Sequence, residues 1–569
     1  MSLTPCSGER KTAWIWAGNV AGHMGTDSGQ GREDDAEAEL LELLSDPRTY
    51  ELPGETIHRI DTHAGRVFLA GERAYKVKRP VRYRYLDFST PEARQRALAA
   101  ELMLNRRTAA KIYERLVPVT RDGQGELRLD GDGKAVDWVL VMRRFDQSAL
   151  LDRQARAGTL DGAMIDALAR AIRRLHDQAA PIELAPAEAS RRVRAVAEEN
   201  FADFATRPDL FEPDVVAAYE NALGNRLEKD GKLIEARAAE GFVRHCHGDL
   251  HLGNICLYEG RPTLFDCLEF DARLAEIDPF YDLAFLLMDL EEHGLRDLSN
   301  RLLSSYLRDP SDLDALALLP LYLSLRAAIR AKVRAAAAAL VDDPGARRAL
   351  EREALDYFAM ARQYLDPPAG LLLAVGGLSG SGKSSLARLV APYIGPAPGA
   401  VHVRSDKLRK DRFGVAETTR LPPEAYEPAV SEAVYEALFD RCARALEAGH
   451  GVVADATFIY EEGRRRLAKL AADKGLTFLG VWLEAPLDTL VHRVTDRQSD
   501  ASDADAAVVR RQVTEETGTI SWQRLDARAA PATLAQDLRA LLRNIPADTG
   551  DDTGIAQPSN DTSDGEGLD

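Results

Sequence analysis

The chain has 569 residues, too many for one hydrophobic core, so its length favours about two or three domains. Its formal net charge of −18 disfavours a nucleic-acid partner, because phosphate backbones are bound by basic surfaces. The sequence has no uninterrupted apolar run of the roughly 18 residues that a membrane helix needs. Its five scattered cysteines form no CxxC pair, so we expect a cytoplasmic protein without a disulfide framework and without a membrane partner.

Both ends of the chain lack the periodicity of a packed core. Residues 1–35 mix Gly, Ser and Asp around one short apolar run, and residues 546–569 carry several acids but no bases. Such segments bury too little apolar surface to offset the entropy of ordering. We therefore expect both ends to be disordered.

The first elements after the N-terminal segment are predicted strands and a helix. Apolar and polar residues alternate over 66–69 and 74–78, as expected for strands. A helix should open near Ser89, because Glu92 follows three residues later and the two can form a capping box. Pro91 fits the first turn of that helix, where its missing N–H costs little.

Helical stretches rich in Ala and Leu follow over 160–235 and 280–365. The sequence Asp366-Pro367-Pro368-Ala369-Gly370 ends the second stretch, since Pro and Gly interrupt a helix. We place a linker at 366–370, between a first domain over 36–365 and a second domain over 371–545.

A catalytic-loop motif lies in the first domain. Residues 247–254 read His-Gly-Asp-Leu-His-Leu-Gly-Asn, which is the kinase spacing H-x-D-L-x-x-x-N. The aspartate of this motif, Asp249, orients or deprotonates an acceptor hydroxyl, and the asparagine, Asn254, holds Mg²⁺ against the triphosphate. A predicted hairpin over 255–265 then delivers Asp266 as a second metal ligand.

These residues, together with Phe265-Asp266 and the segment 278–284, resemble the aminoglycoside phosphotransferase family across roughly 55–340. The resemblance implies an α+β, protein-kinase-like fold. Because the family includes choline, homoserine and fructosamine kinases, it also implies a small hydroxylated acceptor. Gly248 stands where a regulated protein kinase has Arg, and no A-P-E segment follows, which favours small molecules over protein acceptors.

The same resemblance assigns the nucleotide site of the first domain. Lys76 takes the place of the phosphate-binding strand lysine, and Glu101 takes that of its helix partner. Residues 139–145 take the hinge that meets adenine, and 62–65 take the loop that covers the phosphates. Lys78 shares a strand face with Lys76, so either lysine is a candidate. For Glu101 the alternative is a solvated charge on a helix.

The second domain opens with a Walker A sequence. Residues 377–384 read Gly-Leu-Ser-Gly-Ser-Gly-Lys-Ser, placed after an apolar strand and before a helix. Backbone N–H groups of such a loop wrap the phosphates, Lys383 reaches the β- and γ-phosphates, and Ser384 ligates Mg²⁺. The predicted nucleotide-binding residues are Gly377, Ser379, Gly380, Ser381, Gly382, Lys383, Ser384 and Ser385.

Short apolar runs over 371–375, 401–403, 451–454 and 477–483 alternate with helix-length segments, which predicts a doubly wound parallel α/β sheet. Asp455 ends one of these runs like a Walker B aspartate and is a predicted metal ligand. Ala456 follows where mechanical ATPases have a second acid, and no N-K-x-D guanine motif occurs. These features favour a small-molecule kinase over a motor or a GTPase.

Three further residues complete the predicted second site. Asp406 follows a strand whose carboxyl end should face the ligand, so it is the candidate base for the acceptor; the alternative is a helix N-cap. Arg493 and Arg497 lie four apart on a predicted helix and resemble lid arginines that stabilise the transferring phosphoryl group. Ion-paired surface arginines are the alternative.

The second half resembles AAA_33-type, zeta-toxin- and gluconate-kinase-like P-loop kinases across 370–540, and the whole order of domains resembles bacterial bifunctional aminoglycoside phosphotransferase/ATP-binding proteins. The resemblance implies two ATP sites that phosphorylate hydroxyl groups of small molecules with Mg²⁺. A second hypothesis is a regulatory ATPase, in which the kinase-like domain senses a ligand for the P-loop domain. A toxin-like kinase of nucleotide sugars rests on fold analogy alone.

Overall fold

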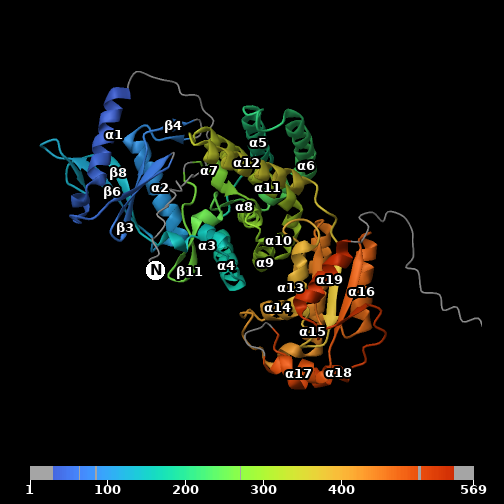
Figure 1. Cartoon of the computed structure of the whole chain (residues 1–569). Coiled ribbons are helices and arrows are strands. Elements are labelled where there is room, and N and C mark those ends of the chain that lie inside the picture. The colour runs from blue at the N-terminus through green and yellow to red at the C-terminus, as the bar shows by residue number, and fades with distance from the viewer. Residues whose placement is uncertain (1–29, 63, 84–85, 270, 497–501, 544–569) are drawn as a thin grey trace, which may run out of the picture. The chain divides into compact units, whose positions relative to one another are not determined.

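The computed structural model describes residues 30–62, 64–83, 86–269, 271–496 and 502–543 (Figure 1). The chain divides into two compact units. One comprises residues up to Pro367 with the short segments 391–402 and 447–452, and the other comprises the remaining segments from Pro368 onward. Within the described ranges, no helix combines the length and the apolarity needed to cross a bilayer.

The N-terminal prediction needs a correction. Helix α1 (Gln30–Ser45) begins inside the segment that we expected to be disordered, so that expectation is wrong for residues 30–35. The rest of that segment, residues 1–29, and the predicted disordered tail at 546–569 lie outside the described residues.

The first unit contains a six-stranded antiparallel sheet. Its strands, in spatial order, are β1 (His58–Asp61), β2 (Gly65–Ala70), β3 (Arg73–Lys78), β8 (Lys134–Arg143), β6 (Tyr113–Arg121) and β7 (Leu127–Leu129). The two predicted strands near the start of the domain, now β2 and β3, are confirmed.

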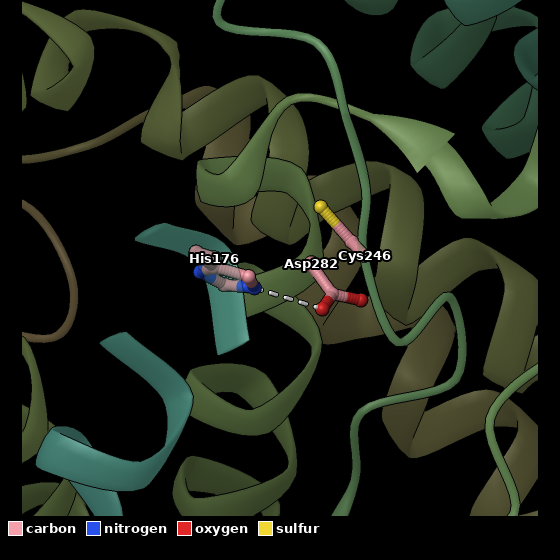
Figure 2. Close-up of side chains that lie close together, drawn as sticks. All are labelled: His176, Cys246 and Asp282. Atoms are coloured by element: carbon pink, nitrogen blue, oxygen red, sulfur yellow. Dashed lines mark hydrogen bonds and ion pairs between the residues drawn. The ribbon is translucent and has the colours of Figure 1, made fainter. Parts of the chain in front are cut away.

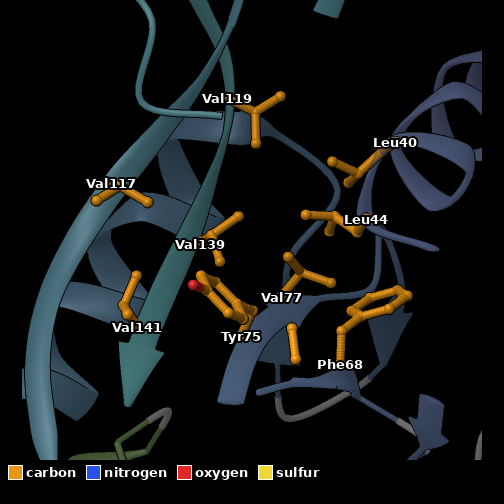
Figure 3. Packing of buried hydrophobic residues seen from close by; sticks show 10 residues of the cluster. Leu40, Leu44, Phe68, Tyr75, Val77, Val117, Val119, Val139 and Val141 are labelled. Atoms are coloured by element: carbon orange, nitrogen blue, oxygen red, sulfur yellow. The ribbon is translucent and has the colours of Figure 1, made fainter. Parts of the chain in front are cut away.

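Helix α1 packs on one face of this sheet. Leu40 and Leu44 of the helix meet a cluster of side chains that includes Phe68, Tyr75 and Val77 (Figure 3). Because side chains alternate along a strand, the neighbours of Tyr75 and Val77 on β3 point to the opposite face. Those neighbours are the candidate lysines.

Helix α2 (Pro91–Ala109) covers the opposite face, where Leu98 packs in a cluster with Leu140. The predicted capping residue is corrected: Thr90, not Ser89, is the N-cap, and its Oγ1 accepts from the backbone N–H of Ala93 at 3.2 Å. Ser89 is unsuited to that role because its backbone N–H and its hydroxyl both donate to Asp87.

The remainder of the first unit is mainly helical. The predicted helical stretches are confirmed, although each is divided into several helices. The helices are α3 (Leu151–Ala157), α4 (Gly162–Gln178), α5 (Pro186–Ala205), α6 (Pro213–Ala239), α7 (Ala272–Ala275), α8 (Pro279–Glu292), α9 (Arg296–Tyr306), α10 (Pro310–Ala315), α11 (Leu319–Ala339) and α12 (Pro344–Leu365). Helix α8 is buried from its first residue to Leu290, because most of its side chains there are apolar, Asp282 and Asp289 being the exceptions.

The C-terminal part of the chain forms the predicted doubly wound α/β fold around a five-stranded sheet. In spatial order its strands are β14 (Val401–Arg404), β15 (Val452–Asp455), β13 (Leu372–Gly377), β16 (Phe478–Glu484) and β17 (Gln523–Asp526). Strand β13 pairs in parallel with β16, and β16 with β17. The helices of this part are α13 (Lys383–Val390), α14 (Ser405–Arg412), α15 (Pro428–Glu447), α16 (Glu461–Asp473), α17 (Leu487–Thr495), α18 (Ala506–Val513) and α19 (Pro531–Arg543).

Candidate active sites

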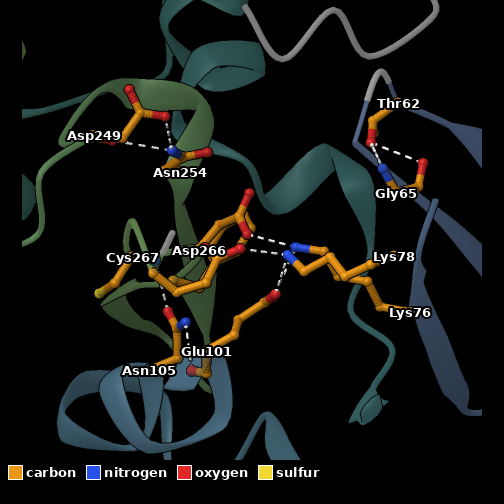
Figure 4. Close-up of polar contacts among 12 residues, drawn as sticks. Thr62, Gly65, Lys76, Lys78, Glu101, Asn105, Asp249, Asn254, Asp266 and Cys267 are labelled. Carbon is orange, nitrogen blue, oxygen red and sulfur yellow. Dashed lines mark hydrogen bonds and ion pairs between the residues drawn. The ribbon is translucent and has the colours of Figure 1, made fainter. Parts of the chain in front are cut away.

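Both candidate lysines of the first site reach the same carboxylate (Figure 4). The Lys76 Nζ donates to Glu101 Oε1 at 2.7 Å, and the Lys78 Nζ donates to Glu101 Oε2 at 2.8 Å. Glu101, on α2, is 0% exposed, so the alternative of a solvated helix charge is wrong. Each oxygen of this buried carboxylate therefore holds one lysine ammonium group in place.

Their other partners distinguish the two lysines. Lys76 also donates to Asp266 Oδ1 at 2.7 Å, whereas Lys78 also pairs with Glu269. Asp266 follows the predicted hairpin, which is confirmed as β10 (Ile255–Tyr258) and β11 (Arg261–Leu264). The geometry therefore places Lys76, rather than Lys78, beside a predicted metal ligand.

The buried ion pairs make the first unit sensitive to acid. Burial alone would raise the pKa of Glu101, but Lys76 and Lys78 hold it at about 2, below its ordinary value of 4.5. A folded-state pKa below the unfolded value gives stabilisation that is present above pH 4.5 and is lost as the pH falls toward 2.

We expect the free energy of unfolding of the intact protein to fall over this pH range more steeply than that of a Glu101→Gln variant. The measurement is urea denaturation of both proteins at a series of pH values. At neutral pH the Glu101→Gln variant should already be less stable, because its two lysines lack their shared carboxylate. Parallel pH profiles for the two proteins would contradict this account.

The catalytic-loop residues Asp249 and Asn254 contact each other directly (Figure 4). The side-chain amide of Asn254 donates to Asp249 Oδ2 at 2.9 Å and to the backbone oxygen of Asp249 at 3.0 Å. Burial tends to raise the pKa of Asp249, but His251, whose Nε2 lies 3.4 Å away, holds that pKa below its usual range. Asp249 is therefore ionised and able to accept a hydrogen bond from a hydroxyl group.

A buried carboxylate on α8 supports this loop from behind. Asp282 accepts the backbone N–H of His247 at 3.0 Å and that of Gly248 at 2.9 Å. Its Oδ2 also lies 3.1 Å from the Nε2 of His176 (Figure 2). Together with Cys246, His176 and Asp282 have the composition of a metal site. The Cys246 thiol, however, donates to the backbone oxygen of Ile277 at 3.5 Å. We interpret the group as a hydrogen-bonded support for the catalytic loop.

A cavity of about 170 Å³ joins the predicted nucleotide-binding residues of the first domain. Lys76, Lys78, Asn254 and Asp266 all line it. Met142 to Phe145 from the predicted hinge and Thr62, Ala64 and Gly65 from the predicted phosphate loop line it as well. Thr62 and Gly65 close that loop tightly, because the Gly65 N–H donates to the Thr62 Oγ1 at 2.9 Å and the hydroxyl donates to the Gly65 oxygen at 2.8 Å.

Asp249 does not line that cavity. It lines a second cavity, of about 120 Å³, whose walls come mainly from helices α5, α6, α7, α8 and α11. Asn254, which contacts Asp249, lines the first cavity. The two catalytic-loop residues are thus in contact with each other while each lines a different cavity.

The Walker A residues form a tight turn between β13 and α13. Gly377 has φ +133°, and a Cβ there would lie 2.6 Å from the backbone oxygen of Leu483. Gly380 has φ +84°, and a Cβ there would lie 2.6 Å from the backbone oxygen of Leu490. Glycine is therefore required at both positions. Ser379 and Ser381 are buried, Gly382, Lys383 and Ser384 are half-buried, and Ser385 is exposed.

The Lys383 Nζ donates to the backbone oxygen of Leu378 at 3.0 Å, so it curls back over the turn. The predicted metal ligand Asp455 is 3% exposed and ends β15 close to this turn, because the Gly377 N–H donates to the oxygen of Thr457 at 3.2 Å. Arg404 lies 3.7 Å from Asp455 and adds a positive charge that the sequence prediction missed.

The candidate base Asp406 lies in the first turn of α14. The alternative that Asp406 is an N-cap is wrong, because the N-cap position is held by Arg404. Arg493 lies on α17, the helix whose Leu490 approaches Gly380, and its Nη2 donates to the backbone oxygen of Ala527 at 2.8 Å. Among the described residues, its partner is thus this backbone carbonyl and not a carboxylate. Arg497 lies outside the described residues.

Three residues that support the first site were not predicted from the sequence. The spacing of two of them from predicted site residues could have indicated them. Asn105 lies one helical turn after Glu101. Its amide donates to the backbone oxygen of Glu101 at 2.8 Å, and its Oδ1 accepts from the backbone N–H of Cys267 at 2.9 Å. Glu269 lies three residues after Asp266 in the same loop. His176, which contacts Asp282 from a distant helix, carried no local signal.

Comparison with known proteins gives matches to both halves. A model of the phosphotransferase enzyme family matches residues 56–319, and a model described as an AAA domain matches residues 372–516. An uncharacterized protein of Mycobacterium tuberculosis (strain H37Rv) is 31% identical over 466 residues, which cover 80% of this chain and 90% of that protein.

Two further matches each cover only part of this chain. The adenylyl-sulfate kinase of Myxococcus xanthus is 29% identical over 126 residues, 22% of this chain and 63% of that enzyme. A solved choline/ethanolamine kinase family protein from Mesorhizobium loti covers 58% of this chain and 98% of its own, with 16% identity and a TM-score of 0.34.

The fold and the family matches together define an ATP-dependent phosphotransferase that joins a protein-kinase-like domain to a P-loop kinase-like domain. The chain belongs to the family of bifunctional aminoglycoside phosphotransferase-like/P-loop ATP-binding proteins.

Proposed function

We propose that the chain has two ATP sites, one in a domain over 36–365 and one in a domain over 371–545, and that each transfers the γ-phosphoryl group to a hydroxyl of a small molecule. The observation that carries the proposal is the assembly of Lys76, Asn254 and Asp266 around one cavity, with Asp249 beside it in the next. Lys76 lies 190 residues before Asp266, whereas Asp249, Asn254 and Asp266 share one short stretch, so the convergence of these two segments supports a working site.

In the first site, Lys76 contacts the phosphates, and Glu101 and Lys78 position it. Asn254 and Asp266 fit Mg²⁺, because the amide of Asn254 is turned toward Asp249, which leaves its oxygen for the cavity, and Asp266 has a second carboxylate oxygen beside the one that binds Lys76. When bound, Mg²⁺ neutralises charge on the phosphates. The acceptor oxygen forms the new bond to phosphorus, the bond from phosphorus to the β–γ bridging oxygen breaks, ADP leaves, and the hydroxyl proton passes through Asp249 to solvent.

In the second site, the backbone of the Walker A turn and Lys383 hold the phosphates, with Ser379, Ser381 and Ser385 at its edges. Ser384 and Asp455 supply the oxygens that Mg²⁺ prefers. Asp406 orients the acceptor hydroxyl, and Arg493 and Arg497 stabilise the charge that develops on the phosphoryl group. The approach of α17 to Gly380 supports the role of Arg493.

The test is transfer of labelled γ-phosphate from ATP into a fractionated metabolite extract by the intact protein. Two chemically different labelled products are expected. A protein that hydrolyses ATP without labelling any metabolite would instead support the regulatory hypothesis, in which the first domain only senses a ligand.

A further inference from the structure

The second cavity of the first unit, which Asp249 lines, has mostly apolar walls. Among the side chains that face it are Val193, Val196, Ile234, Leu268, Ile277 and Ile329. Apolar walls favour an acceptor whose body is also apolar, because its burial there is driven by the hydrophobic effect. Specificity then depends on the polar side chains of the cavity, which include four carboxylates (Glu199, Asp249, Glu276 and Asp278) as well as basic groups.

Four basic side chains line this cavity, and three of them are already paired with carboxylates. The pairs are Arg192 with Glu276 at 3.5 Å, Arg273 with Asp271 at 2.6 Å and Lys332 with Asp203 at 2.9 Å. Arg326 is the exception, since it has no carboxylate within ion-pair distance in the part of the chain that the structure describes. It is 5% exposed.

Arg326 is held in place by backbone and aromatic groups. Its Nε donates to the oxygen of Tyr281 at 3.1 Å, and its Nη1 donates to the oxygen of Gly248, in the catalytic loop, at 3.3 Å. Its guanidinium carbon lies 4.0 Å from the centre of the Tyr281 ring and 4.9 Å from that of Phe285. These contacts fix the guanidinium but use only part of its hydrogen-bonding capacity.

Two buried donors of this stack have no hydrogen-bond partner among the described residues: the Nη2 of Arg326 and the hydroxyl of Tyr281. Tyr281 is 6% exposed, and its burial raises the pKa of the hydroxyl, which therefore remains a donor. Buried donors normally have a hydrogen-bond acceptor. Two neighbouring donors without one, on two side chains that line the same cavity, therefore point to a ligand that accepts hydrogen bonds there.

We propose that the acceptor of the first site is a hydroxylated carboxylic acid with an apolar body, whose carboxylate binds the Nη2 of Arg326 and the hydroxyl of Tyr281. This inference rests on the proposed function of the site. Two donors match the two oxygens of a carboxylate, and the positive charge of Arg326 strengthens such hydrogen bonds.

The first measurement identifies the acceptor. The intact protein labels a metabolite extract with γ-phosphate, and the product that disappears in the Asp249→Asn variant is analysed by mass spectrometry. A carboxylate in its acceptor moiety is expected. A neutral or cationic acceptor overturns the inference while the proposed function stands, and the absence of any product that depends on Asp249 overturns both.

The second measurement uses the purified acceptor and two matched variants. Tyr281→Phe removes a hydroxyl without a partner, so it should leave the melting temperature unchanged and raise the KM for the acceptor about tenfold or more, with kcat largely unchanged. Tyr219→Phe is the control, because its hydroxyl contacts Ser324 at 3.0 Å and it does not line the cavity. It should lower the melting temperature and leave the KM unchanged. An unchanged KM in Tyr281→Phe overturns the proposed contact, and Arg326→Gln, assayed in parallel, should raise the KM further if it folds.

Discussion

Phosphoryl transfer at the first site is expected to fall about 100-fold or more in an Asp249→Asn variant, because the group removed acts on the transition state. The change keeps the size of the side chain but replaces the carboxylate that faces the acceptor cavity. The measurement is the rate of formation of the labelled product that the first site makes, with the melting temperature as a check on folding.

The matched control is Asp209→Asn, the same chemical change at an aspartate whose side chain is 65% exposed and pairs with Arg207. It should leave the rate unchanged. A loss of only a few-fold in Asp249→Asn, or an equal loss in the control, would show that Asp249 does not act on the reacting hydroxyl.

Lys383→Met is expected to abolish the product of the second site by a similar factor, about 100-fold or more. The change removes the charge that meets the β- and γ-phosphates, while the Walker A glycines and the strand before them are retained. The matched control is Lys469→Met on α16, since the Lys469 side chain is 72% exposed and its ion pair among the described residues is with Asp473, one turn away.

The two changes in combination separate the two hypotheses about the chain. If both domains are kinases, each change removes a different product, and the double variant makes neither. If the first domain is a sensor, Lys383→Met alone eliminates all turnover, and Asp249→Asn leaves hydrolysis largely intact. The second pattern would reject two catalytic sites.

Much of this architecture could be predicted because it depends on local pattern. Alternation along 74–78 placed Lys76 and Lys78 on one face, and the structure confirms that both contact Glu101. Glycine spacing predicted the turn at 377–384, and the kinase spacing predicted a hairpin ahead of Asp266. Each of these signals is contained within about ten residues of sequence.

The features that escaped prediction depend on distant partners. Strand β17 has one apolar residue, Leu525, because it lies at the edge of its sheet, and its pairing with β16 is set by the fold. Helix α1 was not predicted, because its first residues are mostly polar and charged. It is stabilised by the burial of Leu40 and Leu44 against a sheet whose strands come later in the sequence. The cavity proposed for the acceptor is lined by five helices and by the catalytic loop, so no single segment encodes it.

Because the Glu101 carboxylate binds two lysines, it also affects how the activity of the first site can be regulated. Many kinases are switched by moving a helix so that its glutamate leaves the phosphate-binding lysine. Here such a movement would break two buried ion pairs at once, leaving Lys76 with Asp266 and Lys78 with Glu269 as their remaining carboxylates. These ion pairs hold helix α2 against β3. We therefore expect the first site to be constitutively assembled, so that its rate depends on the concentrations of ATP and acceptor.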